Sequence, residues 1–141
     1  MKKVLALLVI SVFAASGALA AESSLPVPVK TAQGIKFYNG GVGIGERAKM
    51  PQLYPLKIVL ATSSGLYLND AQITIRDKGG KEVLSVRADN GPWLVADVPA
   101  GSYTVEAVLE GKSKRASVNI AAGKKQTAIF TWPTKDVNMG L

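Results

Sequence analysis

Residues 71–76, Ala-Gln-Ile-Thr-Ile-Arg, and residues 103–109, Tyr-Thr-Val-Glu-Ala-Val-Leu, decide the fold class of this chain. In both stretches apolar side chains return at every second position. Successive side chains of a β-strand point to opposite faces, so a period of two predicts a strand with one buried face. We therefore expect the side chains of Ile73, Ile75 and Val105 in a core between two sheets.

Similar short stretches continue outward from these two at a spacing of about ten residues. Asp77-Lys78-Gly79-Gly80 and Asp89-Asn90-Gly91 separate neighbouring stretches and have the composition of tight turns. The series predicts an all-β sandwich of seven or eight strands that occupies residues 55–132. Its further predicted strands are residues 56–60, 82–88, 93–97, 115–120 and 126–132, and a short strand is also predicted ahead of it at residues 34–38.

One turn of this series carries a more specific motif. From residue 91 to residue 105 the chain reads Gly-Pro-Trp-Leu-Val-Ala-Asp-Val-Pro-Ala-Gly-Ser-Tyr-Thr-Val. A glycine followed two residues later by an aromatic residue, and then by aliphatic-Pro-x-Gly-x-Tyr-x-Val, resembles the carboxypeptidase regulatory-like domain. Residues 67–75 are similar to the first core strand of that family, and the resemblance covers about residues 56–132.

The resemblance implies an immunoglobulin-like or transthyretin-like (prealbumin-like) sandwich and no particular activity. It also implies that Trp93 and Tyr103 are core residues. Pro99 would preset the turn and Gly101 would relax it, so that the Tyr103 hydroxyl can form a hydrogen bond near the corner. Small exported bacterial proteins of unknown role that carry this domain alone are similar over the whole chain.

The N-terminus has the three parts of a secretory signal peptide. Lys2 and Lys3 precede the apolar run from Val4 to Ala15, and Ala18-Leu19-Ala20 provides small residues for cleavage after Ala20. The apolar run is too short for a membrane-spanning helix, and the chain has no cysteine that could carry a lipid anchor. We expect a periplasmic or secreted protein without a transmembrane segment after cleavage.

Residues 21–54 and 133–141 flank the predicted sandwich. The two prolines of Ser-Ser-Leu-Pro-Val-Pro-Val predict an extended, loose arm at residues 22–33. Residues 39–45 contain four glycines, which indicate a flexible connection. Glu46 favours the start of a short helix over residues 46–50, and residues 133–141 have the composition of a flexible tail.

Composition argues against several classes of function. The chain has neither histidine nor cysteine, so the usual general base and the thiol nucleophile are both absent, and we expect a non-catalytic protein without a cofactor. Loss of Lys2 and Lys3 with the signal peptide lowers the formal charge from +7 to +5. A nucleic-acid partner is not expected, because the hairpin pattern divides the basic residues between two ends of the domain.

Without histidine and cysteine, a metal site would have to use oxygen ligands, and one cluster of such residues stands out. If residues 78–80 close a hairpin, its other end brings together four side chains that could share a calcium ion. The same residue types are also the standard residues of turns, so turn structure alone accounts for them. These four residues are Asn69, Asp70, Asp89 and Asn90.

The candidate binding residues lie in predicted loops or in the short helix that follows the glycine-rich segment, outside the core strands where function is less often concentrated. They are Tyr67, Gly43, Glu46 and Arg47. The leading hypothesis is a module that binds another envelope protein, and the alternative is a carbohydrate- or peptidoglycan-binding protein that uses exposed aromatic residues. An inhibitor of an exported hydrolase is a weaker alternative. An exposed row of aromatics would favour a glycan, whereas an ordered glycine loop or an unpaired strand would favour a protein. The oligomeric state stays open.

Overall fold

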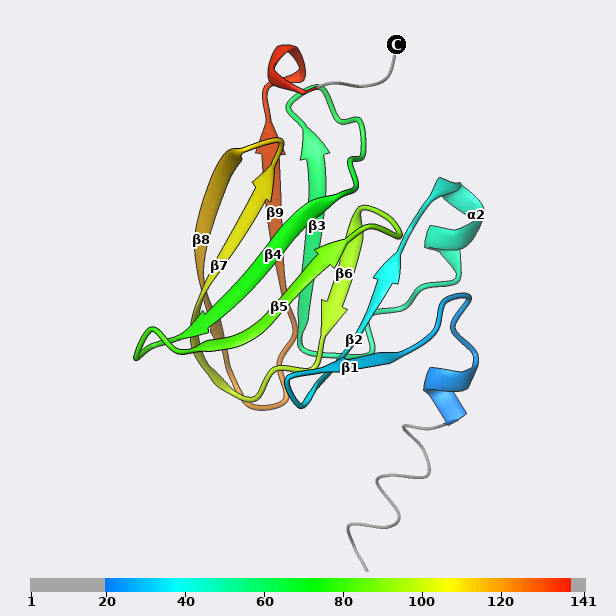
Figure 1. The fold of residues 1–141 in the computed structure, drawn as a ribbon. Coiled ribbons are helices and arrows are strands. Elements are labelled where there is room, and N and C mark those ends of the chain that lie inside the picture. The colour runs from blue at the N-terminus through cyan, green and yellow to red at the C-terminus, as the bar shows by residue number, and fades with distance from the viewer. Residues whose placement is uncertain (1–19, 138–141) are drawn as a thin grey trace, which may run out of the picture.

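The computed structural model describes residues 20–137, and over this range the chain is an all-β sandwich of two sheets (Figure 1). A five-stranded sheet has the order β1-β2-β6-β3-β9, and a four-stranded sheet has the order β5-β4-β7-β8. The strands are β1 (Lys30–Ala32), β2 (Ile35–Gly40), β3 (Leu56–Thr62), β4 (Ala71–Asp77), β5 (Glu82–Ala88), β6 (Trp93–Ala96), β7 (Gly101–Leu109), β8 (Lys112–Ile120) and β9 (Gln126–Trp132).

Strand pairing is antiparallel except between β3 and β9, which are parallel and in register from Leu56 opposite Gln126 to Thr62 opposite Trp132. The predicted fold class is confirmed. The nine strands within residues 20–137 exceed the seven or eight predicted, and β1 is a strand that the sequence does not indicate. The sandwich also starts before residue 55, because β1 and β2 belong to the five-stranded sheet.

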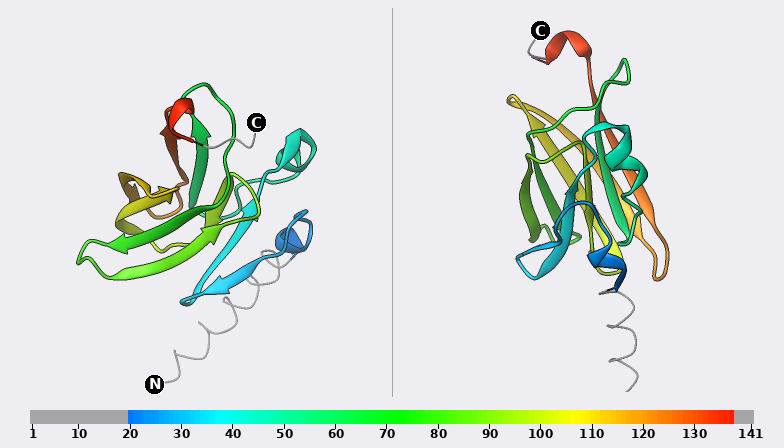
Figure 2. Two further views of the ribbon diagram at one scale, coloured as in Figure 1. Left: turned by 45° about the horizontal axis from the view of Figure 1, so that its top comes forward. Right: turned by 90° about the vertical axis from the view of Figure 1, so that its right-hand side faces the viewer.

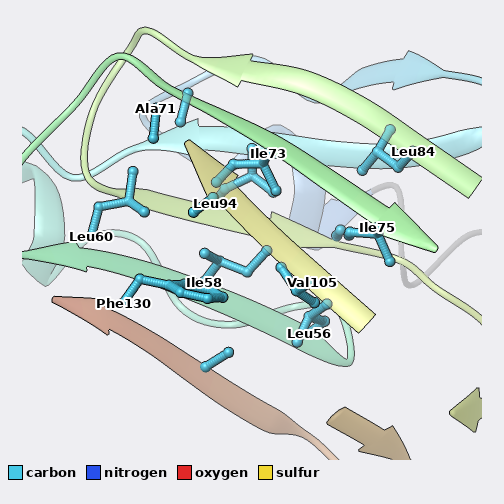
Figure 3. Packing of buried hydrophobic residues seen from close by; sticks show 14 of the residues in the cluster. Leu56, Ile58, Leu60, Ala71, Ile73, Ile75, Leu84, Leu94, Val105 and Phe130 are labelled. Atoms are coloured by element: carbon cyan, nitrogen blue, oxygen red, sulfur yellow. The ribbon is translucent and has the colours of Figure 1, made fainter. Parts of the chain in front are cut away.

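The main core lies between the two sheets and follows the alternation of the sequence. Leu56, Ile58 and Leu60 point inward from β3 and meet Ile73 and Ile75 from β4 (Figure 3). All five side chains are at most 1% exposed. Burying each one contributes about 2 kcal/mol through the hydrophobic effect, so the sandwich is held by its interior without any disulfide. The largest fully buried side chain is that of Trp132, whose indole N–H donates to the Lys112 carbonyl at 3.0 Å.

A second, smaller core covers the outer face of β2 and β6. Tyr38 and Val95 point away from the sandwich interior, and residues 25–29 and 50–54 pack over them. Figures 1 and 2 show both covering segments on the outer side of the five-stranded sheet. The prediction of a loose arm at residues 22–33 is therefore wrong. Both faces of β2 carry buried side chains, and the arm supplies the apolar side chains that cover Tyr38 on its outer face.

Hydrogen bonds fix this cover to the sheet. The Tyr38 hydroxyl donates to the Pro51 carbonyl and accepts from the Leu53 N–H at 2.9 Å. The Tyr54 hydroxyl donates to the Glu22 carboxylate, which also lies 3.3 Å from the Lys36 ammonium. The Glu22 side chain is only 9% exposed, so residue 22 belongs to the folded structure.

Glu22 gives this contact a pH dependence. The Tyr54 hydroxyl and then the Lys36 ammonium hold the pKa of Glu22 below its ordinary value, although burial opposes them. A lowered pKa adds stability above the unfolded value of about 4.3, and that stability is lost as the pH falls through the folded value. Glu22→Gln should therefore lower the free energy of unfolding by about 1 to 2 kcal/mol at pH 7. Urea titrations should show that the free energies of unfolding of Glu22→Gln and wild type come closer together below about pH 4.

Asp89→Asn, at an exposed carboxylate, is the control for this change. It should alter the free energy of unfolding by less than about 0.5 kcal/mol at either pH. A Glu22→Gln deficit that stayed constant from pH 7 to pH 3 would contradict an ionic role for Glu22.

Gln33, in the turn between β1 and β2, joins the two sheets at one edge. Its side-chain carbonyl accepts from the Ser85 N–H at 2.7 Å, and its amide donates to the Glu82 carboxylate at 3.0 Å. The backbone of Gln33 has a φ of 53°. Because β5 is an edge strand, this contact gives a partner to a backbone N–H that its sheet leaves unpaired.

The ends of the described chain complete the fold. Thr134–Asp136 form the 3-10 helix η2, and Val137 packs against the main core, so the prediction of a flexible tail is wrong for residues 134–137. Residues 1–19 of the predicted signal peptide and residues 138–141 of the predicted tail lie outside the described residues. Between residues 20 and 137, no helix has the length and apolar character that crossing a membrane requires.

Candidate functional site

A groove of about 270 Å³ opens beside α2 (Gly43–Ala48), the helix that Figure 1 shows outside the two sheets beyond the end of β2. One wall comes from the segment between β2 and α2, and the other comes from the loop between β3 and β4. The lining residues are Gly41, Val42, Gly43, Arg47, Tyr67, Leu68, Asn69 and Pro92. The structure thus brings three of the four predicted binding residues, Gly43, Arg47 and Tyr67, to one groove.

The helix beside the groove begins earlier than predicted. The structure places it at Gly43–Ala48 in place of residues 46–50. Glu46 accounts for the shift, since its carboxylate accepts from the Gly41 N–H at 2.8 Å and so closes the turn in front of the helix. The side chain does not cap the helix itself but holds the chain that enters it.

The glycine-rich segment is ordered, which corrects the prediction of a flexible connection. Both backbone groups of Gly41 are bound by side chains of α2, because Arg47 donates to its carbonyl at 2.9 Å while Glu46 accepts from its N–H. Gly41 has a φ of +93°, and a β-carbon there would lie 3.1 Å from Cγ of Trp93. The positive φ and the close approach to the indole ring both favour glycine at this position.

Asn39 fixes the opposite side of this region and was not singled out by the sequence. Its buried side-chain amide donates to the carbonyls of Gly91 at 3.0 Å and Trp93 at 2.7 Å. Its side-chain oxygen accepts from the Asn90 N–H at 2.8 Å, and the Asn90 amide donates to the Asn39 carbonyl at 3.0 Å. These bonds tie the end of β2 to the turn before β6 and place Pro92 in the groove wall.

Arg47 and Tyr67 face each other across the groove. The guanidinium carbon lies 4.4 Å from the centroid of the Tyr67 ring, a cation–π contact that holds the two walls together. Tyr67 is 44% exposed, and this confirms the prediction that it lies on the surface.

The rim of the groove is apolar and exposed. Among residues 20–137, five large hydrophobic side chains are exposed, and four of them lie on the groove or next to a lining residue in the chain. Val42 and Tyr67 line the groove, Ile44 follows the lining residue Gly43, and Leu66 precedes Tyr67. Ile44 is 79% exposed. We call these four residues the apolar rim. The fifth exposed side chain, Ile129, lies on β9.

Two of the four candidate calcium ligands, Asp70 and Asn90, form other contacts. The Asp70 carboxylate lies 3.4 Å from Nε of Arg87, and the Asn90 side chain is bound to Asn39. Asp70 and Asp89 do lie at the same end of the β4–β5 hairpin, as predicted. Within the part of the chain that the structure describes, however, no group of three or more acidic side chains could hold a metal ion. Nothing in this arrangement supports calcium binding by Asn69, Asp70, Asp89 and Asn90.

The corner between β6 and β7 has the predicted hydrogen bond. Tyr103 is buried, and its hydroxyl donates to the Pro99 carbonyl at 2.7 Å. Gly101 has a φ of +156°, and its backbone passes close to the Tyr103 ring. The motif residues Pro99, Gly101 and Tyr103 therefore form one structural unit.

Trp93 departs from the predicted core position. Leu94 and Ala96 point from β6 into the main core, so Trp93, at the alternate position, points to the outer face and packs only partly buried against the second core. The Lys57 ammonium lies 3.4 Å from its ring centroid. Burial lowers the pKa of Lys57 below its ordinary value. The indole N–H is buried without a hydrogen-bond partner in the structure.

Tyr103→Phe should lower the free energy of unfolding by about 1 kcal/mol, because it removes the bond to Pro99 and keeps the packing of the ring. Chemical denaturation measures this change. Tyr67→Phe is the matched control at an exposed tyrosine and should change the stability by less than about 0.5 kcal/mol. Equal effects of the two variants would show that the corner bond does not stabilise the fold.

Aromatic residues form no exposed row in the described chain. Of the five that the sequence offers for stacking on sugar rings, Tyr38, Tyr54 and Trp132 are buried, Trp93 is partly buried, and Tyr67 alone is exposed.

In comparisons with known proteins, the chain matches no family model, and no curated protein matches it significantly.

Proposed function

We propose that this protein is a non-catalytic, exported binding module of the bacterial envelope that holds another protein through the groove beside α2. The single observation that carries the proposal is the concentration of exposed large apolar side chains around this groove. Exposed apolar clusters on a folded surface mark sites of protein interaction. Export rests on the signal peptide predicted from the sequence, and non-catalytic action rests on the absence of histidine and cysteine.

The order of the site supports a protein partner. Glu46 and Arg47 hold the glycine turn, and Asn39 holds Pro92, so both walls are fixed before binding. A preformed surface loses less conformational entropy when a partner docks. The apolar rim is mainly aliphatic, with Tyr67 as its one aromatic residue. A sugar ring favours a platform of aromatic faces, so the composition of the rim favours a protein over a glycan.

We further propose that the sandwich belongs to the carboxypeptidase regulatory-like group. The corner of Pro99, Gly101 and Tyr103 supports this assignment through its hydrogen bond. The outward position of Trp93 is the feature that fits the expected pattern least.

Site-specific photocrosslinking in intact cells tests the binding function. A photoreactive amino acid replaces Ile44 in one variant of the full chain and Ile129 in a matched variant, since these isoleucines are 79% and 64% exposed on different parts of the surface. We expect a defined adduct with an envelope protein from position 44 and none from position 129. The captured protein is then purified and its affinity measured by calorimetry.

The affinity measurement decides between specific and incidental capture. Ile44→Asp should weaken binding of the captured protein at least about tenfold, because it places a charge in the apolar rim. Ile129→Asp should leave the affinity unchanged. If both variants lost the same affinity for the captured protein, or if position 44 crosslinked only to peptidoglycan, the proposal of a protein-binding groove would be overturned.

A further inference from the structure

Arg47 differs from the other three arginines of this chain. Arg76, Arg87 and Arg115 each lie within ion-pair distance of an aspartate or a glutamate. Over residues 20–137 no carboxylate lies within such a distance of Arg47, which lines the groove and is only half-buried. The neighbouring Glu46 turns its carboxylate to the Gly41 N–H. The groove therefore contains a guanidinium without a counter-ion from the described chain.

The contacts of Arg47 orient this guanidinium. One N–H donates to the Gly41 carbonyl at 2.9 Å, and the carbon of the group lies 4.4 Å from the Tyr67 ring centroid. A guanidinium has five N–H donors in one plane, and two of them can bind both oxygens of a carboxylate. Of these five donors one is bound to the Gly41 carbonyl, so others remain for such a bond.

The residues around Arg47 indicate which chemical group would lie next to a carboxylate bound by its guanidinium. Val42, Leu68 and Pro92 contribute apolar side chains to the same groove. The volume of about 270 Å³ suits one residue of a partner better than a long segment. An apolar side chain and a carboxylate lie this close together when both belong to the last residue of a chain.

We propose that the groove binds the C-terminal aliphatic residue of a partner protein, with Arg47 binding its α-carboxylate and the apolar lining receiving its side chain. This inference rests on the proposed function and names the chemistry of the partner. Arg47 binds the carboxylate, and Tyr67 and Gly41 position Arg47.

Two small probes that differ in one group test the proposal. N-acetyl-leucine has an aliphatic side chain and a free carboxylate, whereas N-acetyl-leucinamide has the same side chain and no charge. Each is titrated into the ¹⁵N-labelled protein purified after export of the full chain. We expect N-acetyl-leucine to shift the backbone amide signals of residues 42–47 and 66–69, and to bind at least about tenfold more tightly than the amide.

Variants of Arg47 separate the contribution of its charge from that of its paired N–H donors. Arg47→Met should remove the preference for the acid, and Arg47→Lys should reduce it, because lysine keeps the charge and loses the paired donors. Arg115→Met removes the same charge from exposed β8 and should leave the preference unchanged. If Arg47→Met fails to fold, which the loss of the bond to Gly41 could cause, Arg47→Lys still decides the outcome.

The results distinguish this inference from the function on which it rests. Equal affinity for the two probes, with shifts in the groove, would overturn carboxylate recognition and leave the apolar groove as the binding site. Tighter binding of N-acetyl-aspartyl-leucinamide than of N-acetyl-leucine would assign the charge to an internal acidic residue and overturn the C-terminal proposal. Absence of groove shifts with every probe would count against both.

Discussion

Gly91→Ala is expected to lower the free energy of unfolding by about 4 kcal/mol or more, enough to unfold most of a domain of ordinary stability. Gly91 has a φ of +146°, and an added β-carbon would lie 2.1 Å from the Gly40 carbonyl oxygen and 2.3 Å from its carbon. Both clashing atoms belong to the backbone. No change of side-chain rotamer can relieve them, so the end of β2 and the turn before β6 must separate.

Gly65→Ala is the matched control for this prediction. Gly65 also has a positive φ, +94°, but no atom lies within 4 Å of the added β-carbon. Gly65→Ala should lower the free energy of unfolding by only about 1 to 2 kcal/mol, because alanine is strained at a positive φ. Urea denaturation followed by circular dichroism measures both variants. Similar losses in the two would mean that contact with Gly40 is not what requires glycine at position 91.

Asn39→Asp is expected to cost about 3 kcal/mol at pH 7 with almost no change in side-chain volume. The amide group of Asn39 donates to the carbonyls of Gly91 and Trp93, and its oxygen accepts from the Asn90 N–H. Aspartate keeps the acceptor and replaces the donor by an oxygen that faces two carbonyl oxygens. Asn39 is 8% exposed, so water cannot fully compensate.

The pH dependence of this variant provides an internal check. Protonation of the introduced carboxyl restores one donor, so the stability deficit relative to wild type should narrow between pH 7 and pH 4. Asn119→Asp is the control on exposed β8, where the side-chain oxygen accepts from the Ser102 hydroxyl at 3.2 Å and remains after the change. It should cost less than about 0.5 kcal/mol. If Asn39→Asp lowered the stability by as little as this control, the bonds to Gly91 and Trp93 would contribute little.

Both variants also bear on the groove. Pro92 lines it directly after Gly91, and Asn39 holds the carbonyls on either side of Pro92. Asn39→Asp protein that remains folded should therefore show shifted amide signals at residues 41–47. Such shifts would connect the hydrogen bonds of Asn39 at the end of β2 with the geometry of the binding site.

Prediction from the sequence worked where the signal was local. Ile73, Ile75 and Val105 are fully buried, as the period of two requires, and the Tyr103 hydroxyl binds Pro99 at the corner. A strand with one buried face shows that face in its own residues, and a turn shows its glycine or proline. Trp93 was expected in the core from the family resemblance, whereas its side chain lies on the outer face of β6, which the second core covers.

The binding site was predictable only in part. Gly43, Arg47 and Tyr67 were identified as loop residues with suitable chemistry, and the structure brings them to one groove. Asn39 was missed because an asparagine before two glycines has the usual composition of a turn. The predicted strand ended at residue 38, one residue before Asn39; the strand in fact continues to Gly40, which places Asn39 on the same face as Phe37.

The amino-acid sequence by itself determined that this protein folds into two sheets around an apolar interior, because strand period, turn composition and burial of alternate side chains are all local properties. Only the tertiary structure decided that residues 22–29 cover the outer face of β2, that Glu46 and Arg47 order the glycine turn, and that Arg47 meets Tyr67. These contacts join segments that are far apart in the chain or depend on a backbone path that no local pattern specifies. The groove exists because long-range packing brings two loops together.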